Sequence, residues 1–113
     1  MVNDQIGCPT AADDIAKTIL DIIAISTESG FTHWGTYHFA GTPPVSWYGF
    51  ARAIVVGNGA VVLPIATQDY PSLARRPLNS VLDCSRILRV FGIAQPDWRP
   101  ALRNVLDALA TKT

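Results

Sequence analysis

The sequence predicts a small α/β unit with more helix than strand, and three observations support this class. Its 113 residues suit one core, because domains usually run to roughly 100 to 150 residues. Several segments place apolar residues on one face of a 3.6-residue period, as helices do. Two shorter runs between glycines and prolines are β-prone. The expected order is helix, strand, helix, strand, helix, helix.

The first helix is expected over residues 11–26, where apolar side chains recur at helical spacing. Thr10 is predicted to cap it by accepting a hydrogen bond from the amide of Asp13. Asp13 and Asp14 lie in the first turn, where the helix dipole favours negative charge, and Gly30 ends the segment. The apolar residues that share one face are Ile15, Ile19, Ile22 and Ile23.

The middle of the chain is predicted to alternate strand and helix. Residues 35–41 are rich in aromatic side chains between two glycines and favour a short strand. Ser46 is expected to cap a helix over 47–56. A second strand is predicted over 61–66, where Pro64 confines it to a sheet edge or shortens it.

The last third should contain a loop and two helices. Residues 67–79 are expected to form the loop and 80–83 a short extended piece, followed by a helix over 84–92 that Gly92 closes. A final helix should begin at Pro96 and Asp97. The residues that share its apolar face are Trp98, Leu102, Val105, Leu106 and Leu109.

Composition narrows the class of function. Only 16% of the residues are charged, against about 25% in typical domains. This indicates that part of the surface is meant to be covered by another domain or protein. Nine basic and nine acidic side chains cancel, which argues against a nucleic-acid or anionic-membrane binder. Cys8 and Cys84 are expected to stay reduced. No charged apolar leader and no run of 18 apolar residues occurs, so a soluble cytoplasmic protein is expected.

The sequence offers few candidates for catalysis. It contains no glycine-rich phosphate loop between a strand and a helix, and His33 and His38 are interpreted as structural. Tyr48 and Arg52 have the spacing of the Tyr-x-x-x-Lys pair of short-chain dehydrogenases, but arginine replaces lysine, so Tyr48 is interpreted as packing or ligand lining. The other aromatic residues, taken as core, are Trp34, Trp47, Phe50 and Trp98.

Two loops carry a high density of hydrogen-bonding groups. Residues 4–10 run into the N-terminus of the first helix, and residues 75–80 (Arg-Arg-Pro-Leu-Asn-Ser) approach another helix. Arginine offers bidentate donors to a diphosphate, and Asn and Ser add orienting hydrogen bonds. From composition alone, anion binding and the fixing of loops by internal hydrogen bonds both remain open for this second cluster.

Four stretches in order resemble one family. DQIGCPTAADDIA, GTYHFAGTPPVSWYGFARAI, YPSLARRPLNSVLDCSRILRVFGI and DWRPALRNVLDAL are together similar to the C-terminal part of the dTDP-4-dehydrorhamnose reductases, a group of extended short-chain dehydrogenases. The resemblance covers nearly the whole chain. It implies the smaller, substrate-binding lobe over residues 1–113, mainly helical with a few short strands, and without the Rossmann domain.

The resemblance also implies an activity. These enzymes reduce dTDP-4-dehydro-6-deoxy-L-mannose to dTDP-L-rhamnose with NADPH, which the N-terminal Rossmann domain binds. This sequence matches neither the glycine motif nor the Tyr-x-x-x-Lys pair, so no catalytic residue is carried over. The substrate-binding residues that the family motifs imply are Gln5, Pro9, Thr10, Arg76, Pro77, Asn79 and Ser80. Some members bind magnesium at a dimer contact, and Asp13 matches one of its ligands.

Several expectations follow from the resemblance. The chain is expected to be an excised domain or a truncated product that is inactive alone, and an exposed apolar surface could pair two copies. The main alternative is a non-enzymatic interaction module, because the regulatory subunit of methionine adenosyltransferase resembles the same reductases. An intact glycine motif and Tyr-x-x-x-Lys ahead of residue 2 would favour the reductase, and their loss the regulator.

Overall fold

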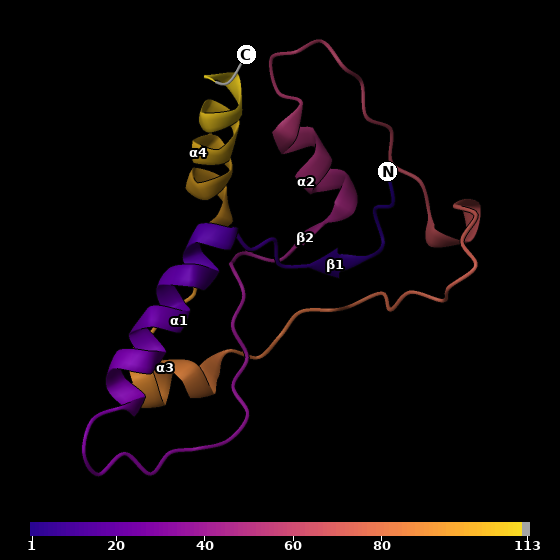
Figure 1. The fold of residues 1–113 in the computed structure, drawn as a ribbon. Helices are drawn as coiled ribbons and strands as arrows, with labels where there is room; N and C mark the ends of the chain where they lie inside the picture. The colour runs from indigo at the N-terminus through magenta and orange to yellow at the C-terminus, as the bar shows by residue number, and fades with distance from the viewer. Residues whose placement is uncertain (112–113) are drawn as a thin grey trace.

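The computed structural model describes residues 1–111, which form four α-helices, one short 3-10 helix and two very short strands. The fold divides into a body and an arm (Figure 1). The body contains a two-stranded sheet, two of the helices and the 3-10 helix, and the arm contains the other two helices. The elements are β1 Ile6–Gly7, α1 Ala12–Ser26, β2 Val45–Ser46, α2 Trp47–Ile54, η1 Thr67–Asp69, α3 Ser85–Phe91 and α4 Trp98–Ala110.

The body is built around the two strands. β1 and β2 are antiparallel, with Ile6 opposite Ser46 and Gly7 opposite Val45. Ser46 caps α2 as predicted, because its side chain accepts from the amide of Gly49 at 3.0 Å. This single residue therefore ends the strand and starts the helix.

Helices α2 and α4 pack together through aromatic rings. The rings of Phe50 and Trp98 meet edge to face at 5.4 Å. Trp98 is buried, and its indole nitrogen donates to the Pro43 carbonyl at 2.8 Å. The prediction that Trp98 is a core anchor is confirmed, since its apolar ring and its one polar atom are both accommodated.

The arm is held by a small hydrophobic cluster. Ile87 and Phe91 of α3 are buried with Ala40 and Cys84, and Ile22 and Ile25 of α1 pack against them. Gly92 ends α3 with a φ of 68°, the left-handed conformation that glycine adopts most readily. The helices predicted over 11–26 and 84–92 are therefore confirmed as α1 and α3.

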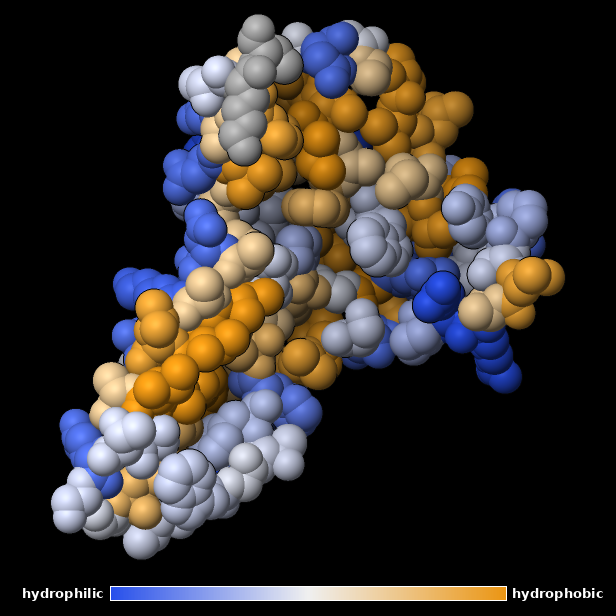
Figure 2. Space-filling model, in the orientation of Figure 1, coloured by the Kyte–Doolittle hydropathy of each residue, from blue (hydrophilic) through white to orange (hydrophobic). Residues whose placement is uncertain are grey.

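Most of the predicted apolar face of α1 lies at the surface. Ile15, Ile19 and Ile23 are 40%, 51% and 52% exposed, and Leu20 beside them is 66% exposed. Figure 2 shows an apolar band running along this helix. The Cα radius of gyration is 17.2 Å, whereas a compact domain of this length has about 13 Å. The chain alone thus leaves apolar surface that a compact domain would bury.

Several local predictions were wrong. Neither 35–41 nor 61–66 forms a strand, and 61–66 contributes only an isolated bridge between Ile65 and Val2. Residues 80–83, predicted as a short extended piece, lie outside the helices and strands. The strands that form are two residues long, too short to produce a periodic pattern in the sequence. Thr10 does not cap α1, whose N-cap is Ala11 without a side-chain hydrogen bond.

The interpretation of several side chains as core was also wrong. Trp34 and Trp47 are 67% and 55% exposed. Trp34 lies in the loop between α1 and β2, and Trp47 is the first residue of α2. Val81 and Leu82, the apolar residues of the segment 80–83, are also 37% and 42% exposed. Within the described part of the chain, no helix has the length and apolarity needed to cross a membrane.

Candidate functional site

Two adjoining cavities lie on the body beside β1 and the start of α2. The larger has a volume of about 1160 Å³ and is bounded by the N-terminus, Thr67 and the loop 70–78. The smaller, of about 320 Å³, lies between residues 5–10 and 45–50 and includes Ser80. Gln5 and Trp47 line both. Concave sites of this size, with a few convergent polar groups, are typical of ligand binding.

Backbone hydrogen bonds bring the two donor-rich loops together. The amide of Ile6 donates to the Leu78 carbonyl at 2.8 Å, and the amide of Ser80 donates to the Ile6 carbonyl at 2.9 Å. Ile6 and Asn79 thus form an isolated parallel bridge. Segments more than 70 residues apart therefore form one wall of the cavities.

A chain of side-chain hydrogen bonds fixes Gln5. Its amide nitrogen donates to the Thr67 hydroxyl at 3.3 Å, and that hydroxyl donates to an Asp4 carboxylate oxygen at 2.5 Å. The Thr67 amide also donates to Asp4. The hydrogen bonds from the Thr67 side chain, and then from its backbone, lower the pKa of Asp4 below its ordinary value.

Thr10 joins the first loop to the rest of the fold. Its hydroxyl donates to the Cys8 carbonyl at 3.1 Å and accepts from the Gly41 amide at 2.9 Å. A side chain at Gly41 would meet the Pro9 carbonyl oxygen at 2.2 Å, so only glycine permits this approach. Pro9 and Thr10 line the smaller cavity.

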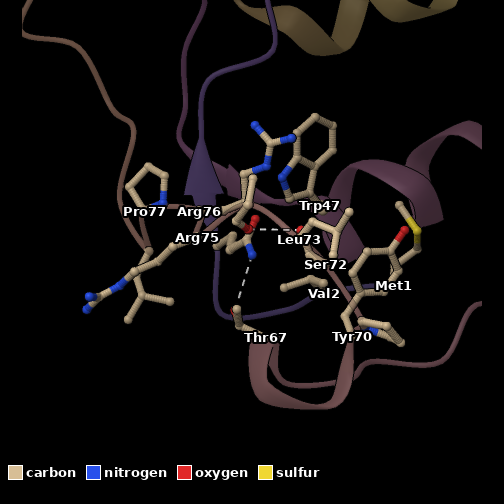
Figure 3. Close-up of a pocket in the computed structure, with 14 residues that line it drawn as sticks. Met1, Val2, Trp47, Thr67, Tyr70, Ser72, Leu73, Arg75, Arg76 and Pro77 are labelled. Atoms are coloured by element: carbon tan, nitrogen blue, oxygen red, sulfur yellow. Dashed lines mark hydrogen bonds between the residues drawn. The ribbon is translucent and has the colours of Figure 1, made fainter.

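The two adjacent arginines differ in direction. Figure 3 shows Arg76 extending on the Trp47 side of the larger cavity, whereas Arg75 points away from it. Arg76 is exposed and has no hydrogen bond or ion pair with the residues that the structure describes. Its guanidinium is therefore available to an anion, and Pro77 borders the same cavity.

Asn79 and Ser80 have internal partners. The Asn79 side-chain oxygen accepts from the Val81 amide at 2.9 Å, and Asn79 lines neither cavity. The Ser80 hydroxyl donates to the Ile6 carbonyl at 3.2 Å while facing the smaller cavity. The structure thus gives Asn79 a loop-fixing role and leaves Ser80 at the cavity wall.

Comparison with known proteins identifies the family. The family model described as "RmlD substrate binding domain" matches residues 1–111. The chain belongs to this family.

Similar proteins carry one recurrent name. A dTDP-4-dehydrorhamnose reductase of Aggregatibacter actinomycetemcomitans is 44% identical over 113 residues, which cover 93% of this chain and 38% of that protein. The solved structure of such a reductase from Clostridium acetobutylicum has a TM-score of 0.85 and 32% identity over 96% of this chain and 38% of its own. The RmlD substrate-binding domain thus spans about two-fifths of these relatives.

A second solved structure adds the cofactor of a relative. The reductase from Bacillus anthracis, in complex with NADP, has a TM-score of 0.75 and 34% identity over 91% of this chain and 35% of its own. The likeness of two solved reductases confirms the predicted small, mostly helical lobe with short strands.

The described residues of this RmlD domain do not by themselves form a metal site. No group of three or more His, Cys, Asp or Glu side chains is found there that could hold an ion. Asp13 is exposed in the first turn of α1, and neighbouring helical side chains such as Asp14 diverge by about 100°. Magnesium at Asp13 stays a prediction that would require ligands from another chain or domain.

The near match to a dehydrogenase pair has a structural explanation. The Arg52 guanidinium lies over the ring of Tyr48 at 5.5 Å from its centroid, a cation–π contact. This contact agrees with the packing role predicted for Tyr48.

Sequence reasoning missed several residues that line the larger cavity. Trp47 was assigned to the core, and the loop residues Thr67, Tyr70 and Leu73 were not singled out. A signal existed for Trp47, because the first position of a helix beside a loop is seldom covered on all sides. No pattern marks the other three.

Proposed function

We propose that this chain is the substrate-binding lobe of an NADPH-dependent dTDP-4-dehydrorhamnose reductase. The observation that carries the proposal is the family match over residues 1–111. The cavities support it, because Gln5, Thr10, Arg76 and Ser80, drawn from both family motifs, line two adjoining hollows. Arg76 would hold the diphosphate of the dTDP-sugar, and Gln5 would orient the nucleoside.

The reaction of the whole enzyme would be a ketone reduction. A hydride from NADPH would be added to the carbonyl carbon at C4 of the sugar, and a tyrosine outside this chain would give a proton to the oxygen, leaving dTDP-L-rhamnose and NADP⁺. This chain has no residue in the role of that tyrosine. Its part would be to bind and orient the nucleotide-sugar.

The exposed face of α1 supports a covering partner. Ile15, Ile19 and Ile23 form an apolar stripe of a kind that soluble monomers seldom leave open. We infer that the dinucleotide-binding domain of the parent protein covers this stripe in the cytoplasm. A homodimer through the same stripe is the competing arrangement, and the mass of the free chain in solution would reveal it.

Titration with dTDP tests the binding role. Chemical shifts of the amides at Gln5, Arg76 and Ser80 are expected to move saturably, and Arg76→Gln should weaken binding about tenfold or more. Arg75→Gln is the matched control, because it removes an equal charge from the neighbouring side chain that points away from the cavity. Equal losses in the two variants, or no saturable shift in the native chain, would contradict the proposal.

An activity assay tests the division of labour. The native chain, given NADPH and the 4-keto sugar nucleotide, is expected to oxidise no NADPH above the rate without protein. Turnover by the 113-residue chain alone would show that it contains a catalytic group of its own.

A further inference from the structure

The indole of Trp47 is exposed, and no side-chain hydrogen bond or ring contact among the described residues gives it a structural role. It is 55% exposed, although tryptophan is highly buried on average. By contrast, Trp98 is 6% exposed and its indole nitrogen donates to a carbonyl. Among the described residues the Trp47 indole nitrogen has no such acceptor. Trp47 therefore presents a large flat surface to solvent at the junction of two cavities.

The backbone holds this indole in a defined place. Trp47 is the first residue of α2, directly after the capping Ser46, and its amide donates to the Gln5 carbonyl at 3.4 Å. The next amide, of Tyr48, donates to the Val2 carbonyl at 2.9 Å. A fixed backbone holds the attachment point of the indole between the two cavities, so a ligand that stacks on it need not order this segment of the chain.

The polar group beside it has a defined orientation. The single hydroxyl proton of Thr67 goes to Asp4, so the hydroxyl can only accept from Gln5, which must then present its NH₂ to Thr67. The side-chain oxygen of Gln5 is left as an acceptor, with no partner among the described residues. An acceptor beside an aromatic face suits a ring that carries an N–H on its edge.

We propose that Trp47 is the stacking platform for the pyrimidine base of the nucleotide, with the Gln5 side-chain oxygen accepting from the ring N3–H. The inference rests on the proposed function. Bases of any sequence stack on aromatic side chains, and thymine presents an N3–H donor. Arg76 lines the same cavity on the Trp47 side (Figure 3), which places a cation where the diphosphate joined to such a base would lie.

The test compares two ligands and three variants of the full chain. The ligands are dTDP and inorganic pyrophosphate, which lacks the base. Trp47→Leu is expected to weaken dTDP binding about tenfold and to change pyrophosphate binding less than twofold. Trp47→Phe should recover most of the affinity because it keeps an aromatic face. Trp34→Leu is the matched control, since Trp34 is exposed too but lies outside both cavities.

Each outcome has one meaning. Equal affinity for dTDP in Trp47→Leu and Trp34→Leu would refute stacking of the base on Trp47 and would leave the proposed function intact. An equal loss for dTDP and pyrophosphate in Trp47→Leu would also refute this stacking, since the effect would then not pass through the base. If the native chain binds neither ligand, the binding role in the proposed function fails first. Far-UV circular dichroism reports whether each variant is folded, because each variant lacks one of the three tryptophans.

Discussion

Replacing Thr10 by valine tests whether this motif residue serves binding or architecture. The change keeps the shape of the side chain but removes the hydroxyl, which donates to the Cys8 carbonyl and accepts from the Gly41 amide. Gly41 is buried, so its amide would lose its partner where water has little access. We expect Thr10→Val to impair folding whether or not a nucleotide is bound.

The magnitude follows from the two hydrogen bonds. A buried donor left without a partner costs about 1–3 kcal/mol, and loss of the second hydrogen bond adds about 0.5–1.5 kcal/mol. The free energy of unfolding should therefore fall by about 1.5–4.5 kcal/mol. Thr10→Ser is the control, because it keeps the hydroxyl and removes one methyl group, worth at most about 0.8 kcal/mol.

Urea denaturation followed by intrinsic tryptophan fluorescence, in which buried Trp98 should change its environment most, measures the difference between the variants. Amide exchange at Gly41 gives a local readout, since that proton should exchange rapidly in Thr10→Val and slowly in both the native chain and Thr10→Ser. The reasoning is refuted if Thr10→Val unfolds at the same urea concentration as Thr10→Ser and keeps Gly41 protected.

Three further predictions concern stability and reactivity. Ile87→Ala should lower the free energy of unfolding by about 2–5 kcal/mol and Ile87→Val by about 0.5–1.5 kcal/mol, because Ile87 is only 1% exposed; equal effects in thermal melts would contradict the packing. Hydrogen bonds from Arg99 lower the pKa of Asp97 to about 2, so its stabilising effect exists above pH about 4 and disappears as pH falls towards 2. The stability difference between the native chain and Asp97→Ala should shrink over that interval, and a constant difference would count against the hydrogen bonds that Arg99 donates to Asp97. Burial, and then the neighbouring Cys84, raise the pKa of the Cys8 thiol, so at pH 8 iodoacetamide should alkylate Cys8 more slowly in the folded chain than in urea; equal rates would contradict this environment.

The helices could be predicted from the sequence because each has a local signal. The apolar period marks α1, the Ser46 cap marks α2, and Gly92 marks the end of α3. The strands could not be predicted, because β1 and β2 exist through pairing between distant segments rather than through a pattern of their own. The glycine-bounded run 35–41 has β-prone side chains but lacks a partner strand.

The candidate site could be predicted in part. The sequence marks the loops 4–10 and 75–80 by their donors, but only the fold shows that Ile6 joins them. The fold also distinguishes two residues of the same donor-rich loop. Arg76 is available to a ligand, whereas the Asn79 side chain accepts a hydrogen bond within its own loop. Such differences depend on contacts across the fold, so no local pattern could show them for Asn79.

The loop from Pro71 to Ser80 offers an opportunity for protein engineering. All ten of its residues are exposed, and it is fastened to β1 mainly near Leu78 and Ser80. Substitutions at such surface positions usually change stability by less than about 0.5 kcal/mol. A library that varies residues 72–75 would therefore change the rim of the larger cavity while leaving Arg76 and the hydrophobic cluster of the arm unchanged.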